Sequence, residues 1–249
     1  QMLEYGQFCP VAKTAEILGE KWTLLIVREL LLGATRFNQI QRAMSKISPT
    51  VLNKRLATLQ RHGLLVRKRV PEQKVYEYQL TECGRELFPL VVKMAEWGMR
   101  WARSTMRDEE LDVGLLMTDI QRRIDPAKLP SGQTVIKFKF TDLKNYANWW
   151  IKIVDRNVDL CVDNPGYDVD VFFTADLRTM TEVWMGDVSL QKAQDDRRLM
   201  VNVLSPHLRN LKSWFPLYRL ADIRPARTAP ARTDQRGKYS TFDHPGHEV

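Results

Sequence analysis

The stretch at residues 47–56, ISPTVLNKRL, carries side chains suited to hydrogen bonding with a nucleic acid. Thr50 offers a hydroxyl, Asn53 an amide that both donates and accepts, and Lys54 an ammonium group. Thr50 precedes the other two by three and four residues, so all three share one face if the stretch is a helix. Groups of these kinds can bind base edges and phosphates in the DNA major groove.

The surrounding residues predict that this stretch is a helix. Ser48 can cap the first turn, and Pro49 takes the first helical position, where its missing N–H costs nothing. Leu52, Leu56 and Leu59 fall on the face opposite the polar groups and predict a buried side. The stretch is therefore an amphipathic helix with a small, polar and basic outer face.

The neighbouring elements complete a DNA-binding arrangement. A shorter helix is predicted over residues 37–44, and two helices joined by a short turn form a helix-turn-helix, whose second helix enters the major groove. A basic strand at 64–70, a turn at 71–74 and a strand at 75–80 then predict a hairpin wing. The predicted DNA contacts are Arg36, Ser48, Pro49, Thr50, Asn53, Lys54, Arg67, Lys68, Arg69 and Lys74. Arg42, like Arg36, is predicted to contact the DNA backbone.

The charge distribution agrees with a polyanion-binding first part. Residues 1–107 hold 18 Lys and Arg against 9 acids, whereas residues 108–222 hold 15 against 18. The whole chain carries a net charge of +8 over 249 residues. A basic first half joined to a mildly acidic second half suggests a DNA-binding unit attached to a unit of another kind.

Two further helices are expected in the first half. The apolar spacing predicts one helix from Thr14 to Leu32, ended by Gly33. After the hairpin, residues 82–107 predict one long helix with a kink near Pro89. Its apolar side chains are more numerous than a lone exterior helix needs.

The first hundred residues resemble the HxlR-type winged-helix transcription regulators. The resemblance lies in LGEKWTLLI at 18–26, RFNQI at 36–40, ISP at 47–49 and EYQLT at 77–81. It implies a homodimer that binds a short, pseudo-palindromic double-stranded DNA operator and pairs its protomers through the ends of this domain. The family usually places a basic residue after the Ser-Pro, where this chain has Thr50, so the resemblance leaves the base preference open.

The same resemblance draws attention to Cys9, which precedes Pro10. Some HxlR-type proteins use a cysteine near the N-terminus to sense oxidants or electrophiles, and Lys13 could favour the reactive thiolate. The alternative is a buried free cysteine that acts as a small apolar residue. Cys9, Cys83 and Cys161 lie too far apart for a Cys-x-x-Cys pair, which argues against a zinc site and against a disulfide framework.

Asp108-Glu109-Glu110 changes the composition and marks the start of the second half. A helix is predicted at 111–124, and alternation near 136–140, 149–153, 158–162 and 169–173 then predicts a four-stranded antiparallel meander. Helices follow at 177–185 and 189–195, then a strand at 198–203 and a last helix from Ser205-Pro206. The run TADLRTMTEVWMGDVSL at 174–190 resembles the sterol-carrier-protein type 2 fold, in which helices cover a sheet around an apolar tunnel for lipids.

That second resemblance implies an apolar ligand in the C-terminal half. The candidate lining residues are Trp149, Phe172, Met180, Trp184, Met185, Trp214 and Phe215. Ordinary core packing is the alternative for each of them. No set of residues typical of catalysis, of a metal site or of phosphate binding stands out, so neither an enzyme nor a cofactor is expected.

The sequence thus predicts an α+β protein with a winged helix-turn-helix at 1–107, a sterol-carrier-like antiparallel sheet covered by helices at 108–222, and a disordered tail at 223–249. No apolar run is long enough to cross a membrane and no signal peptide is evident, so a cytoplasmic location is expected. The leading hypothesis is a dimeric regulator whose operator affinity responds to an apolar effector. The alternatives are a structural C-terminal domain, with control through Cys9, and a lipid carrier whose DNA module only localises it.

Overall fold

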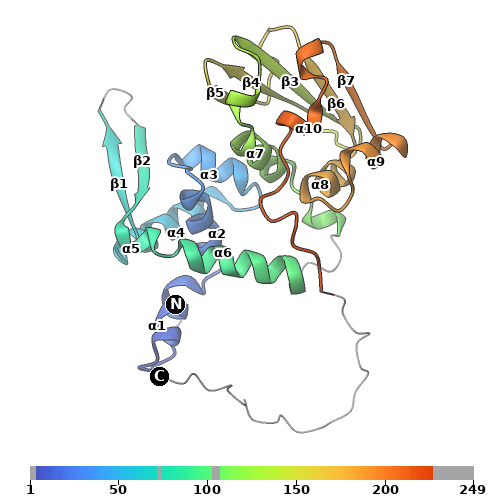
Figure 1. Ribbon diagram of the computed structural model, residues 1–249. Coiled ribbons are helices and arrows are strands. Elements are labelled where there is room, and N and C mark those ends of the chain that lie inside the picture. The colour runs from blue at the N-terminus through green and yellow to red at the C-terminus, as the bar shows by residue number, and fades with distance from the viewer. Residues whose placement is uncertain (1–3, 72–74, 103–106, 227–249) are drawn as a thin grey trace, which may run out of the picture.

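The helix predicted after Ser48 is present in the computed structural model, which describes residues 4–71, 75–102 and 107–226. Ser48 Oγ accepts a hydrogen bond from the Val51 amide at 3.3 Å, and Pro49 opens the helix. Figure 1 shows a hairpin projecting beside the N-terminal helices and a sheet with its own helices at the far end. The first elements are α1 (Pro10–Leu18), α2 (Thr23–Leu31), α3 (Phe37–Ala43), α4 (Pro49–Arg61), β1 (Leu65–Val70) and β2 (Val75–Leu80).

The prediction of one helix from Thr14 to Leu32 is wrong, because α1 and α2 are separate. Trp22 has φ 79°, a left-handed conformation that cannot continue a right-handed helix. The break turns the chain so that Ile26, Val27 and Leu30 of α2 enter the same apolar cluster as Leu18 of α1. Tertiary packing here overrides a continuous helical pattern.

The prediction of one long helix over residues 82–107 is also wrong. The chain forms α5 (Glu82–Arg85), α6 (Phe88–Trp97) and a π-helix over Gly98–Ala102. Pro89 lies in the first turn of α6, so it starts this helix and does not kink a longer one. Gly84 of α5 lies against β1, since a Cβ there would come within 2.1 Å of the Leu64 carbonyl oxygen.

The C-terminal sheet has five strands in the order β5-β4-β3-β6-β7. The prediction of an antiparallel meander holds for the first three strands and fails at β6, which pairs parallel to β3. The chain leaves β5 at one edge and returns next to the central strand, so the fourth strand is not the neighbour of the third. The strands are β3 (Gln133–Phe140), β4 (Asn148–Val154), β5 (Asn157–Cys161), β6 (Val171–Ala175) and β7 (Leu199–Val203).

Four helices cover one face of this sheet. Alternate residues of the strands, among them Ile136, Phe138 and Ile151, share an apolar cluster with buried residues of all four helices. The helix at 177–185 forms as predicted. The last helix, expected from Ser205-Pro206, is instead a short 3-10 helix over Pro206–Leu208 followed by one α-helical turn. The helices are α7 (Val113–Arg123), α8 (Leu177–Met185), α9 (Leu190–Asp195) and α10 (Leu211–Trp214).

The described residues contain no helix long and apolar enough to span a lipid bilayer. Within the same ranges there is no group of three or more His, Cys, Asp or Glu residues placed to hold a metal ion.

A buried carboxylate joins the two parts of the chain, here named the winged-helix part (4–102) and the C-terminal part (107–226). Glu29 of α2 is completely buried, and its Oε2 accepts a hydrogen bond from Arg122 Nη2 of α7 at 2.7 Å. Its Oε1 accepts from Arg28 Nε at 2.9 Å and Nη2 at 2.6 Å. A buried charge is tolerated only when it is paired in this way.

Contacts of α3 and the residues after it with α7 and the residues before it extend the same interface. Ser45 Oγ donates to Asp112 Oδ2 at 2.7 Å, and Lys46 Nζ donates to the Glu109 carbonyl. A Cβ at Gly114 would lie 2.6 Å from the Arg42 carbonyl oxygen, so the backbones of α3 and α7 touch. The two parts are therefore held together by polar contacts and by close backbone packing.

We expect Glu29→Gln to lower the free energy of unfolding by about 3 kcal/mol, because the guanidinium groups lose the charge that compensates them. Urea denaturation of the full chain measures this. Glu96→Gln is the matched control: Glu96 pairs with Lys93 on the surface of α6, and surface pairs contribute little. Equal losses in both variants would contradict the assigned role of Glu29.

Asp119 lies on the same helix as Arg122. Burial raises the pKa of the Asp119 carboxyl from its ordinary 3.8 to about 6; Arg28 and Arg122 oppose this rise, and Glu29 adds to it. The folded protein therefore binds this proton more tightly than the unfolded chain does. Stability from Asp119 is complete at low pH and is lost as pH rises from about 4 through about 6.

Asp119→Asn removes this titration. We expect the variant to gain stability relative to the wild type as pH rises from about 4 to about 7, by up to about 3 kcal/mol. Chemical denaturation of both proteins at several pH values measures the difference. A difference that does not change with pH would show that the Asp119 pKa is ordinary.

Candidate nucleic-acid interface

The outer face of α4 consists of exposed polar side chains. Thr50, Asn53 and Lys54 are exposed, whereas Leu52 and Leu56 on the opposite face are at most 2% exposed. No ion pair of Lys54 is found among the described residues. The helix therefore presents an uncompensated ammonium, an amide and a hydroxyl along its first two turns.

Contacts from the α1–α2 turn hold α4 in place. Arg55 Nε donates to the Lys21 carbonyl at 3.0 Å, and Arg55 Nη1 contacts the Glu20 carboxylate. Arg55 is thus used for positioning, and its charge is neutralised by Glu20. Lys54, the residue before it, is exposed and has no such acid partner among the described residues, so its charge stays available.

The wing stands next to α4 (Figure 1), and its first strand, β1, carries three basic residues in the run LVRKRV. In the β1–β2 register Lys68 pairs with Glu77 and Arg69 with Tyr76, and both basic side chains are exposed. The Arg67 guanidinium lies over the Tyr76 ring, 3.7 Å from its centroid, which orients that cation. The cations of β1 are thus exposed beside α4, as the predicted phosphate contacts require.

The wing is fixed to the helices at its base. The Tyr78 amide donates to the Thr35 carbonyl at 2.7 Å, which ties β2 to the loop before α3. Arg36 Nε lies 3.5 Å from Glu77 Oε1 of the same strand. Arg36 thus forms an ion pair that joins the start of α3 to β2. Its predicted contact with the DNA backbone would use the same side chain.

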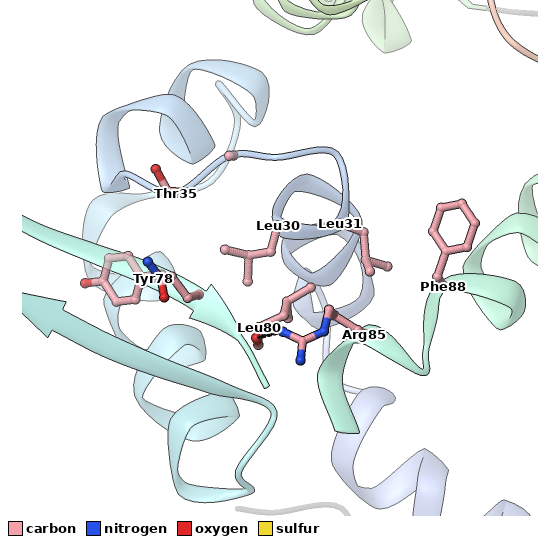
Figure 2. Close-up of a pocket in the computed structure, with 9 residues that line it drawn as sticks. Leu30, Leu31, Thr35, Tyr78, Leu80, Arg85 and Phe88 are labelled. Carbon is pink, nitrogen blue, oxygen red and sulfur yellow. Dashed lines mark hydrogen bonds between the residues drawn. The ribbon is translucent and has the colours of Figure 1, made fainter. Parts of the chain in front are cut away.

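A groove of about 580 Å³ lies between α2, β2 and the start of α6. Figure 2 shows Leu30 and Leu31 on α2, with Phe88 beyond them at the start of α6. Arg85 Nη1 donates to the Leu80 carbonyl at 2.6 Å. The Arg85 guanidinium in this groove is therefore already used to hold α5 against the end of β2.

Comparison with known proteins assigns the winged-helix part. The profile of the HxlR-like helix-turn-helix family matches residues 17–106. The HTH-type transcriptional regulator YvaP of Bacillus subtilis is 34% identical over 108 residues, which are 43% of this chain and all of YvaP. The chain belongs to the HxlR-like helix-turn-helix family.

Two further relatives cover the same region. The regulator YdeP of Bacillus subtilis is 38% identical over 96 residues, 37% of this chain and 73% of YdeP. A solved structure of the reduced form of the transcriptional regulator YodB from B. subtilis shares 30% identity with a TM-score of 0.35, over 40% of this chain and all of that chain. The protein is a helix-turn-helix transcriptional regulator, and its curated relatives are named as regulators and not as enzymes.

The HxlR-like assignment confirms the resemblance stated for the first hundred residues, and it leaves the individual DNA contacts as predictions. Lys74 lies outside the described residues. Arg42, predicted to contact the DNA backbone, instead donates from Nη1 to the Leu160 carbonyl at 3.3 Å and faces the C-terminal part. Sequence reasoning did not include Ala57 and Gln60, which extend the exposed face of α4 at the same helical spacing.

The candidate ligand-lining residues lie mostly inside the core of the C-terminal part. Trp149, Met180, Trp184, Trp214 and Phe215 are at most 8% exposed and belong to one apolar cluster. Phe172 and Met185 are half-buried. The indole nitrogens of Trp149 and Trp214 donate to the carbonyls of Tyr146 and Leu208, respectively. Ligand binding by these residues stays a prediction.

Cys9 directly precedes α1 and is partly exposed. The Lys13 ammonium, which was expected to favour a thiolate, instead contacts Glu16 at 2.9 Å. Among the described residues no cation is therefore identified that would stabilise the Cys9 thiolate. Redox sensing by Cys9 stays a prediction.

Proposed function

We propose that this regulator is a homodimer that binds a double-stranded DNA operator, with α4 in the major groove and the wing on the backbone. The observation that carries the proposal is the exposed row of Thr50, Asn53 and Lys54 on a helix whose other face is buried. Hydroxyl, amide and ammonium groups at this spacing suit base edges and phosphates. A cytoplasmic location follows for a protein with this target.

Exposed apolar side chains on α1, on the residues just before it and on α6 support the dimer. Phe8, before α1, and Val11 of α1 are 99% and 76% exposed, and Met94 and Trp97 of α6 are 48% and 62% exposed. Large apolar side chains gathered on helices without a covering partner are typical of protein interfaces. A two-fold dimer would place its two copies of α4 on the two halves of a pseudo-palindrome.

The C-terminal part is proposed as an effector module, with residues 1–107 and 108–222 as the two domains. Its apolar residue types and the sterol-carrier resemblance support a lipid-like effector. The close packing of Phe173 on Phe215, with ring centroids 4.9 Å apart, favours the alternative in which the sheet core itself is only structural. An effector that acts on the operator must bind the two states of the regulator unequally.

Lys54→Ala tests the groove assignment. We expect operator affinity to fall by about 1–3 kcal/mol and the preference at one base pair to relax, because a side chain that reads a base edge is lost. Titration of operator duplexes with single base-pair changes measures both effects. The exposed Lys139 of β3 supplies the control variant Lys139→Ala, which should bind like the wild type.

Arg69→Ala tests the wing. Affinity for operator and for unrelated DNA should fall alike, and the slope of affinity against salt should decrease by about 1, because one phosphate contact is lost. Fluorescence anisotropy over a series of salt concentrations measures the slope. If neither this variant nor Lys54→Ala alters binding, the DNA interface lies elsewhere.

Trp97→Glu tests the dimer. A carboxylate on this apolar surface should yield monomers in sedimentation experiments, and operator affinity should fall by about 100-fold, because each half-site is then bound independently. Met200→Glu, on the exposed edge strand β7, is the control. A dimer that survives Trp97→Glu and binds normally would exclude α6 from the interface.

A further inference from the structure

A pocket of about 300 Å³ lies between the winged-helix part and the C-terminal part. Its apolar walls come from both sides of the junction: α2 and α6 face α8 and the segment after α10 (Figure 1). The apolar lining includes Leu31, Val91, Ala95, Trp184, Tyr218 and Leu220. The volume is at the lower end of the range typical of small-molecule sites.

Basic side chains also line this pocket. Arg28, Arg122, Arg123 and Arg219 contribute to it, together with the single acid Asp119. Arg122 Nη2 is bound to Glu29, whereas Arg122 Nη1 is buried and makes no hydrogen bond within the described part of the chain. Its nearest acid, Asp119, has Oδ1 at 3.7 Å, beyond hydrogen-bond distance.

The charges around the pocket leave an excess of positive charge. The four guanidinium groups face two carboxyl groups, those of Glu29 and Asp119. Burial raises the pKa of Asp119 to about 6, so this group resists carrying a negative charge here. A buried N–H donor without an acceptor costs free energy, which an anionic ligand would recover.

We propose that this pocket binds a small amphipathic monocarboxylate, with its apolar body between α6 and α8 and its carboxylate at Arg122 and Arg219. The ligand carboxylate accepts a hydrogen bond from Arg122 Nη1. Arg219, an exposed residue at the pocket, supplies a second cation. The inference rests on the effector half of the proposed function and moves the effector from the sheet core to the junction.

The position of the pocket gives the ligand a route to α4. Leu31 lies on α2, and the buried residues of α2 share one apolar cluster with Leu52 and Leu56 of α4. Trp184 lies on α8 of the other part. A ligand that contacts both walls therefore stabilises one relative arrangement of the two parts.

Binding of decanoate to the full chain tests the proposal, with decan-1-ol as the neutral comparator. Isothermal titration at a pH above the Asp119 pKa of about 6 should show decanoate binding at least about tenfold more tightly than decan-1-ol, because only decanoate satisfies the guanidinium groups. Equal affinities, or no binding of either compound, would overturn the proposal.

Variants localise the site. Arg219→Gln should weaken decanoate about tenfold and leave decan-1-ol unchanged, and Asp119→Asn should tighten decanoate, because a competing carboxylate is removed. Ala95→Trp fills the pocket and should abolish binding of both compounds. Lys93→Gln, a charge change on the same helix α6 but outside the pocket, is the control.

If Ala95→Trp does not fold, the gain in affinity from Asp119→Asn still decides, because a misfolded protein cannot bind more tightly. Normal decanoate binding by both Arg219→Gln and Asp119→Asn would place the ligand elsewhere and overturn the proposal. Operator binding by the ligand-free chain is measured separately. Loss of decanoate binding with intact operator binding refutes this inference alone, and loss of operator binding refutes the proposed function.

Discussion

The buried carboxylate of Glu29 constrains the whole arrangement. It lies in the last turn of α2, among the apolar side chains that form the winged-helix core, where an unpaired charge would be strongly destabilising. Arg28 comes from the same helix, but Arg122 must come from α7. The C-terminal part therefore supplies one of the two guanidinium partners of this buried charge.

In the helix-turn-helix, α7 packs against the first helix and not against the outer face of the second. The first helix, α3, lies against α7, where Gly114 allows the two backbones to touch and Arg42 bonds to the Leu160 carbonyl. The second helix, α4, is held from behind by Arg55 and keeps its outer face exposed. The basic residues of α3 and α4 thus differ in function. Arg42 and Arg55 position helices, whereas Lys54 keeps an uncompensated charge among the described residues.

Local signals in the sequence predicted the elements that depend on local chemistry. Ser48-Pro49 predicted the start of α4, and the periods of three to four and of two predicted its buried face and the wing. Features that depend on contacts between residues far apart in the sequence were not predictable from these local signals. The left-handed Trp22 breaks an otherwise continuous helical pattern, and β6 pairs with β3 because the chain crosses the sheet after β5. An acid within the apolar run LLIVRELLL was the one visible sign of a buried pair, but its partner lies 93 residues away.

Arg122 connects this structural constraint to the proposed ligand. A guanidinium presents several N–H donors in a fixed plane, so one edge can hold Glu29 while another faces the pocket. A lysine would supply a single point charge and could not serve both sites with the same geometry. An anion at Arg122 Nη1 shares a cation with the pair that holds the two parts together. Any change in that pair acts on α2, whose apolar neighbours include the buried face of α4. The junction and α4 are thus linked through a continuous set of packed side chains, and the buried carboxylate of Glu29 lies at the start of that set.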